Sequence, residues 1–204
     1  MASIVHEGGP ALSSFATLPI DPVRVAIDAT DGSVRPAGPV QTRRMSDLRG
    51  LFADTAAWER ALPEDRVVYE VASSPVPEEA GELPQSITTI HPGDVGGEFH
   101  MTKGHMHPKW RGEIYLGLAG TGGLLLYDGR TPSYIDMAPG VIGYIPPGWA
   151  HRSVNTGDEP YRFLAVYPGD SGHDYDWVLA HGMGYRVLRG TGAGPELRPF
   201  TPAR

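Results

Sequence analysis

Cysteine is absent from the 204-residue chain, so the fold holds no disulfide bond and no thiolate can bind a metal ion. That absence suits the reducing conditions of the cytoplasm. No apolar run approaches the length of about 20 residues that crosses a bilayer. The opening segment, MASIVHEGGP, lacks the basic start and apolar core of a secretory signal peptide. We therefore expect a cytoplasmic protein without a membrane partner.

Positive charge is also scarce. The chain has 17 Lys and Arg residues against 24 Asp and Glu residues, for a formal net charge of -7. No block of basic residues is present, which argues against nucleic-acid binding. A small anionic ligand is still compatible with this balance, because local side chains and backbone amides decide its binding. We expect a small-molecule partner.

Glycine and proline, by contrast, are abundant, at 27 and 20 residues. They separate short segments rich in β-branched, aromatic and aliphatic residues, a pattern typical of many turns between short strands. The pair Asp128-Gly129 is a strong signal for a hairpin turn. The predicted strands are 67–73, 86–91, 98–102, 113–118, 123–128, 133–137, 141–145, 151–155 and 161–167. This spacing predicts an all-β, closed or sandwiched antiparallel architecture.

The chain is expected to fold as one domain with appendages. Residues 1–40 lack a sustained period and are interpreted as an N-terminal arm, 41–190 as the barrel domain, and 191–204 as an irregular C-terminal tail. One or two short helices are expected between Met45 and Leu62. Ser46 is a candidate cap for the first, and Asp54 or Thr55 for the second.

Histidine is concentrated around two glycine-framed segments, GHMHPKWRGEIYLGLAG and GVIGYIPPGWAHRSVN. Residues at i and i+2 of a strand point to the same face, so His105 and His107 are expected to project together. A hairpin would bring Glu113 back opposite this pair, and His151 would return on a later strand. Three imidazoles and one carboxylate suit a divalent transition metal with positions left open for a substrate.

These residues resemble the two motifs of the cupin superfamily. Gly140, Pro146, Gly148, His151 and Asn155 fit the second motif, and the first fits with one departure: five residues, rather than three or four, separate His107 from Glu113. The longer gap is typical of the cupin-type glucose-6-phosphate isomerases known from archaea and some bacteria. The pieces RRMSDLRGLF, TKGHMH, PPGWAHRSVN and GDSGHDY are similar to that branch. The likeness spans about residues 40 to 185.

The resemblance implies a single-domain cupin, a double-stranded β-helix or jelly-roll barrel, that interconverts glucose 6-phosphate and fructose 6-phosphate in glycolysis and gluconeogenesis. It implies His105, His107, Glu113 and His151 as ligands of one divalent metal per subunit. Fe2+ is the first expectation, with Mn2+, Ni2+ or Zn2+ as alternatives. A homodimer is also implied, and it agrees with the tendency of open barrel edges to pair.

Two further groups of residues are candidates for handling the substrate. Proton transfer between C1 and C2 of the sugar is assigned to Glu113, Tyr167 or His173, and a tyrosine near a metal can have a lowered pKa. A hydride shift that needs no base is the alternative mechanism. The resemblance implies that hydroxyls and backbone amides bind the substrate phosphate; the residues concerned are Tyr69, Thr88, Thr102, Gly104 and Tyr175. Strand alternation should turn Thr89 away from this site.

Three alternatives use the same pocket. The first is another phosphosugar isomerase, such as a mannose-6-phosphate isomerase. The second is an iron cupin dioxygenase, in which three histidines and one glutamate hold the iron that activates oxygen. The third is a metal cupin that binds a sugar without converting it.

Overall fold

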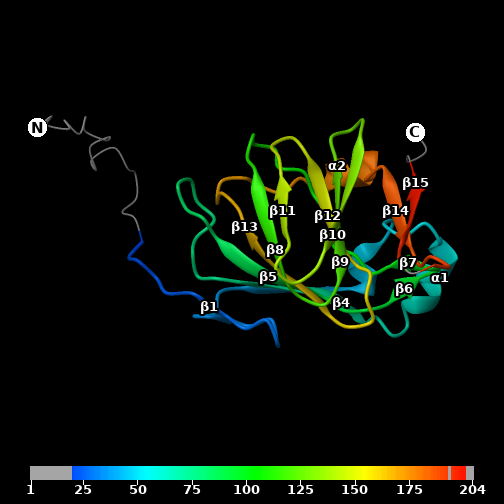
Figure 1. The fold of residues 1–204 in the computed structure, drawn as a ribbon, viewed down its shortest axis with the longest axis horizontal. Helices are drawn as coiled ribbons and strands as arrows, with labels where there is room; N and C mark the ends of the chain where they lie inside the picture. The colour runs from blue at the N-terminus through cyan, green and yellow to red at the C-terminus, as the bar shows by residue number, and fades with distance from the viewer. Residues whose placement is uncertain (1–19, 193, 201–204) are drawn as a thin grey trace, which may run out of the picture.

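The largest sheet of the molecule is antiparallel and six-stranded. The structure is a computed structural model that describes residues 20–192 and 194–200. In order across this sheet, the strands are β11 (Ile142–Ile145), β8 (Glu113–Ala119), β13 (Tyr161–Val166), β5 (Gln85–Ile90), β4 (Val67–Ser73) and β3 (Val40–Arg44). The sheet therefore brings together segments from both halves of the chain (Figure 1).

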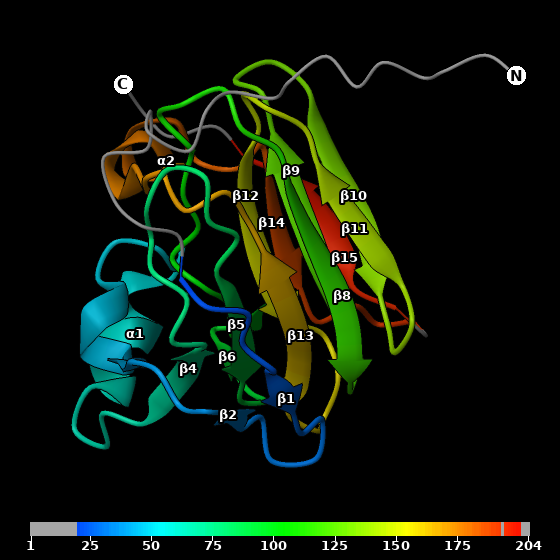
Figure 2. The ribbon, with the colours of Figure 1, turned by 90° about the vertical axis from the view of Figure 1, so that its left-hand side faces the viewer.

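A second layer faces this sheet. It contains a three-stranded sheet in the order β10 (Pro132–Met137), β9 (Gly122–Tyr127) and β12 (Ala150–Asn155). Gly143 of β11 lies so close to this layer that a Cβ there would approach Leu124 Cδ2 to 2.6 Å and Met137 Sδ to 3.3 Å. The two sheets thus enclose the core, and Figure 2 shows β9, β10 and β12 behind β8, β11 and β13.

A smaller sheet covers the outer side of β9 and β12. Its order is β15 (Glu196–Pro199), β14 (Tyr185–Leu188), β7 (Glu98–Phe99) and β6 (Asp94–Val95). Leu124, Leu125 and Leu126 of β9 are all buried, as expected for a strand packed on both faces. On β12, alternation directs His151 to one face and Arg152 to the other.

The helices are short. A 3-10 helix covers Met45–Leu48, α1 covers Thr55–Ala61 and α2 covers Tyr175–His181. The Asp54 side chain caps α1 by accepting a hydrogen bond from Ala57 N at 2.8 Å, which confirms one of the two expected caps. The expected Ser46 cap is wrong, because Ser46 lies inside the 3-10 helix and Asp47 accepts the Arg44 N–H instead.

The prediction of an all-β fold with one or two short helices is confirmed, and the Asp128-Gly129 turn joins β9 to β10. Two local expectations differ from the structure. The strand expected at 98–102 is regular only over Glu98–Phe99, and the C-terminal tail is not wholly irregular, because β15 lies in it and pairs with β14. The second difference follows from pairing with β14, because the tail has no strand signal of its own.

Part of the expected N-terminal arm lies outside the described residues, namely positions 1–19. Over the rest, β1 (Ala26–Ile27) and β2 (Val34–Arg35) form a small hairpin. Gly32 in its turn lies against the outer face of the six-stranded sheet, close to Thr89. Neither α1 nor α2 has the length and apolar character needed to cross a bilayer.

Candidate functional site

His105 and His107 are positioned by backbone pairing outside the regular strands. His105 N donates to His151 O at 3.1 Å, and His151 N donates to His105 O at 2.9 Å. Met106 forms the same reciprocal pair with Asp174, at 3.0 and 2.8 Å. The segment from His105 to His107 is therefore held from two sides. Although it is not a regular strand, both histidine rings face one point, as the spacing predicted.

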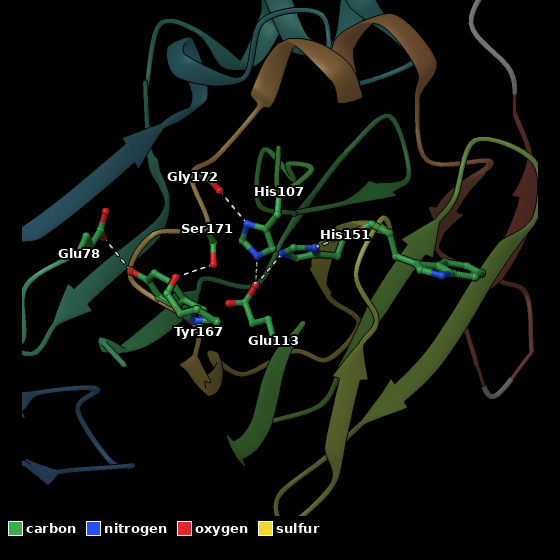
Figure 3. A network of polar contacts seen from close by, with 9 residues as sticks. Glu78, His107, Glu113, His151, Tyr167, Ser171 and Gly172 are labelled. Atoms are coloured by element: carbon green, nitrogen blue, oxygen red, sulfur yellow. Dashed lines mark hydrogen bonds and ion pairs between the residues drawn. The ribbon is translucent and has the colours of Figure 1, made fainter. Parts of the chain in front are cut away.

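Glu113 reaches the histidines by a different route from the one expected. The predicted hairpin is wrong, because β8 pairs with β11 and β13 and not with the segment of His105 and His107. Glu113 is the first residue of β8, at the end of that sheet nearest the histidines. Its Oε2 lies 2.9 Å from His107 Nε2 and 3.0 Å from His151 Nε2 (Figure 3).

The four side chains form a compact buried cluster. One ligand atom from each of His105, His107, Glu113 and His151 lies within 4.8 Å of every other. His105 Nε2 is buried and has no hydrogen-bond partner among the described residues, and His151 Nε2 is buried against the Glu113 carboxylate alone. A buried polar atom without a partner is costly. One metal ion at the convergence point would bind both nitrogens, so the donor set fits a divalent transition metal.

Burial and contacts within the cluster shift the pKa values of three of its side chains. Burial alone would lower the pKa of His107, but hydrogen bonds with Glu113 and the Gly172 carbonyl raise it above its ordinary value. Burial would raise the pKa of Glu113, but contacts with His107 and His151 hold it below its ordinary value. Burial and the neighbouring histidines push the pKa of His105 well below its ordinary value. The cluster thus supplies an ionised carboxylate and a neutral His105.

A polar cavity of about 130 Å³ opens beside this cluster. Every residue predicted to handle the substrate or the proton lines it. These residues are Tyr69, Thr88, Thr102, Gly104, Glu113, Tyr167, His173 and Tyr175. His105 and His151 also line the cavity, whereas His107 does not. The sequence-predicted residues therefore meet around one space, although they come from five separate stretches of chain.

Thr102 and Gly104 form a turn at one wall of the cavity. The Thr102 hydroxyl oxygen accepts the Ser153 N–H at 3.1 Å, so its own proton is free to be donated. Gly104 has a φ of +72°, and a Cβ there would approach His151 O to 2.9 Å. Glycine is required at this position by both the backbone conformation and the close packing. Thr89, as expected, lies away from the cavity, although it is buried by the N-terminal hairpin.

Tyr167 and His173 also line the cavity, and their rings are neighbours. The ring centroid of His173 is 4.4 Å from that of His105 and 5.7 Å from that of Tyr167. Burial and the nearby His107 lower the pKa of His173. A lowered pKa of Tyr167 beside a bound metal stays a prediction. Without the metal, burial and the hydrogen bond of Tyr167 to Glu78 Oε1, at 2.7 Å, raise the pKa of this tyrosine.

Three components of the site were not found by sequence reasoning. Tyr115 lines the cavity, and the alternation rule could have found it, because it lies two residues beyond Glu113 on β8. Glu78 comes from an irregular segment that carries no recognisable signal. The Gly172 carbonyl accepts a hydrogen bond from His107 Nδ1 at 2.7 Å, and a backbone acceptor has no sequence signature.

The two facing sheets and the cluster of three histidines and one glutamate between them define an all-β cupin with a site able to hold one metal ion. The sequence model of the family "Glucose-6-phosphate isomerase (GPI)" matches residues 42–198. The chain therefore belongs to the glucose-6-phosphate isomerase family, in its cupin-type branch.

Individual relatives agree with this assignment. A protein of Thermococcus kodakarensis named glucose-6-phosphate isomerase is 46% identical over 176 residues, which cover 84% of this chain and 91% of that protein. Its namesake from Pyrococcus abyssi is 44% identical over 178 residues, covering 84% and 92%. A bacterial namesake, from Sinorhizobium medicae, is 38% identical over 176 residues, covering 82% and 81%.

Among solved structures, oxalate oxidase in complex with the substrate analogue glycolate superposes on 49% of each chain at 16% identity, with a TM-score of 0.41. This likeness is too low to bear on the chemistry, so the sequence relatives carry the assignment.

Proposed function

We propose that the chain is a metal-dependent aldose–ketose isomerase that interconverts glucose 6-phosphate and fructose 6-phosphate. The observation that supports this most is the position of the buried cluster of three histidines and one glutamate at the edge of a hydroxyl-lined cavity. The names of the relatives point to the same substrate pair. We further propose that the protein acts in the cytoplasm, in glycolysis or gluconeogenesis.

His105, His107, Glu113 and His151 would hold the metal, with Fe2+ as the proposed ion and Mn2+, Ni2+ or Zn2+ as alternatives. A divalent metal supplies Lewis acidity, which stabilises the negative charge that develops on the oxygens of C1 and C2. The protein supplies the remaining groups. Tyr69, Thr88, Thr102 and Tyr175 are proposed to donate hydroxyl protons to the substrate phosphate, and the Gly104 turn lets that phosphate approach the backbone closely.

Proton transfer between C1 and C2 is proposed for the wall formed by Glu113, Tyr167 and His173. All three side chains reach the cavity, and the His173 ring lies against that of His105. General acid–base catalysis requires such groups within reach of the reacting carbons. A homodimer is also proposed, because β11 is an edge strand of the six-stranded sheet and carries exposed Ile142 and Tyr144. Light scattering that gives a monomer would contradict the dimer.

The activity is tested with fructose 6-phosphate as substrate and glucose 6-phosphate detected by a coupled assay. Turnover is expected from metal-loaded protein, with loss after chelation and recovery after metal is returned. A parallel assay with mannose 6-phosphate and an oxygen-uptake measurement address the alternative chemistries. Binding of the sugar phosphate without turnover, by protein shown to contain metal, would refute the proposed reaction.

A further inference from the structure

The segment between His107 and Glu113, residues 108–112, has no role in the ligand set although it is longer than the general cupin pattern. It lies beside residues 168–173, the segment that follows β13. Pro108 packs against Gly172, and a Cβ added to Gly172 would approach Pro108 Cγ to 3.0 Å. These two irregular segments therefore meet above the metal-ligand cluster.

Their main polar contact is a three-residue ion-pair network, which we call the clasp: Asp170 with Lys109 and Arg111. Arg111 Nε donates to Asp170 Oδ1 at 3.0 Å, and Arg111 Nη2 donates to Oδ2 at 2.9 Å. Lys109 Nζ donates to Oδ2 at 3.1 Å. The Asp170 side chain is only 13% exposed, whereas those of Lys109 and Arg111 are 56% and 43% exposed. Bidentate pairing of an arginine with a carboxylate fixes orientation as well as distance.

Asp170 is connected to the metal ligands through the two residues that follow it. Ser171 is fully buried, and both its N–H and its hydroxyl donate to the Pro168 carbonyl, at 2.9 and 2.5 Å. Gly172 follows Ser171, and its carbonyl accepts the hydrogen bond from His107 Nδ1 (Figure 3). That bond places the proton of a neutral His107 on Nδ1 and leaves Nε2 to bind a metal. Gly172 O is thus the outer partner that orients this ligand.

We propose that the clasp formed by Asp170, Lys109 and Arg111 is a positioning device that holds the Gly172 carbonyl on His107 and thereby sets the affinity of the metal site. This proposal rests on the proposed metal centre. It also gives the extra length of residues 108–112 a role, because that segment carries both basic partners of Asp170. Exposed ion pairs add little to global stability, so the effect should be seen at the site and not in overall unfolding.

The test compares Asp170→Asn and Arg111→Gln with Arg189→Gln as a matched control. Arg189 is also 43% exposed and pairs with a carboxylate, Asp94, at 2.7 Å, but neither residue belongs to segment 108–112 or segment 168–173. Zn2+ affinity is measured by competition with a chelator. Because loss of an outer partner costs roughly 10- to 100-fold in metal affinity, we expect about 3- to 30-fold weaker binding in the two clasp variants. The control should bind Zn2+ like the parent, and thermal midpoints should be close in all three variants.

Two further measurements separate the clasp from the metal centre. In metal-free protein, amide hydrogen exchange at Ser171 and Asp174, whose N–H groups donate to Pro168 O and Met106 O, should be faster in Asp170→Asn than in the parent. A charge exchange, Arg111→Asp with Asp170→Arg, should recover part of the lost affinity. Unchanged Zn2+ affinity in both clasp variants, or an equal loss in the Arg189 control, would overturn the proposal. A parent protein that fails to bind Zn2+ or any other divalent metal would overturn the metal centre itself, while the exchange measurement would still test the clasp.

Discussion

Replacing Tyr167 with phenylalanine removes the hydroxyl proposed to transfer a proton and keeps the packing of the ring. The ring of Tyr167 is 7% exposed, and phenylalanine keeps its packing. The only protein partner of the hydroxyl among the described residues is Glu78, at 2.7 Å. Glu78 lies at the exposed rim of the cavity, so its carboxylate can exchange the lost hydrogen bond for water. We therefore expect a loss of stability of about 1 kcal/mol or less.

The effect on turnover should be much larger if Tyr167 takes part in proton transfer. A positioned acid or base contributes roughly 100- to 10,000-fold to rate, which corresponds to about 2.7 to 5.4 kcal/mol of activation free energy. A fall in kcat of at least about 100-fold, with bound metal retained, is the expected result. With the metal content unchanged, the small loss of stability could not explain a decrease of that size.

The measurements are kcat and KM with fructose 6-phosphate, together with metal content by elemental analysis. Tyr161→Phe is the matched control, because Tyr161, the first residue of β13, is also a buried tyrosine but does not line the cavity. Its kcat should equal that of the parent. If Tyr167→Phe keeps kcat within about threefold of the parent, Tyr167 is an aromatic wall of the cavity and the proposed proton transfer must be assigned to Glu113 or His173.

The remaining predictions concern the metal, the phosphate and pH. His151→Ala should lose metal and activity together in elemental analysis and the coupled assay, whereas an active variant without metal would contradict the ligand assignment. Thr88→Val should raise KM for the sugar phosphate, and Thr89→Val, on the other face of β5, should leave KM unchanged; equal effects would remove Thr88 from the phosphate site. Burial lowers the pKa of His100 below 6.5, so the folded state disfavours its charged form. The contribution of the buried, neutral His100 to the free energy of unfolding is present above about pH 6.5. It is lost as the pH falls towards the folded-state pKa, with a slope of at most about 1.4 kcal/mol per pH unit. Urea unfolding of His100→Gln between pH 7 and 5 should therefore show a shallower loss of stability than the parent, and an identical slope would refute this assignment.

Features encoded by neighbouring residues were predicted well. The Asp128-Gly129 turn, the Asp54 cap and most strands depend on local conformational preference and alternation, and the structure has them where the sequence indicated. The wrong prediction of a cap at Ser46 shows the limit of this reasoning. The Ser46 backbone N–H donates to Oδ1 of Asp65, which lies 19 residues further along the chain, and a contact of that separation cannot be predicted from local spacing.

Features that depend on contact with another segment were not predicted. The tail after residue 190 has no strand signal of its own, yet β15 forms because β14 provides a partner edge. The contact of Tyr167 with Glu78 was missed for the same reason. The sequence gives no indication that Glu78, 89 residues away, would place a carboxylate against the Tyr167 hydroxyl. Burial and this carboxylate raise the pKa of Tyr167, and the lowering expected from a nearby metal stays a prediction.

The four residues predicted to meet do form one cluster, but the chain connects them differently from the expected hairpin. This difference explains why the unusual spacing is tolerated. In the expected hairpin, the length of the chain between His107 and Glu113 would set their register, and one extra residue would turn Glu113 to the opposite face. In the structure, His105 is fixed by its backbone pair with His151, Met106 by its pair with Asp174, and Glu113 by the pairing of β8 with β11 and β13. The intervening segment is therefore free to change length without moving any ligand. Its length can then serve another purpose, which we propose to be the clasp.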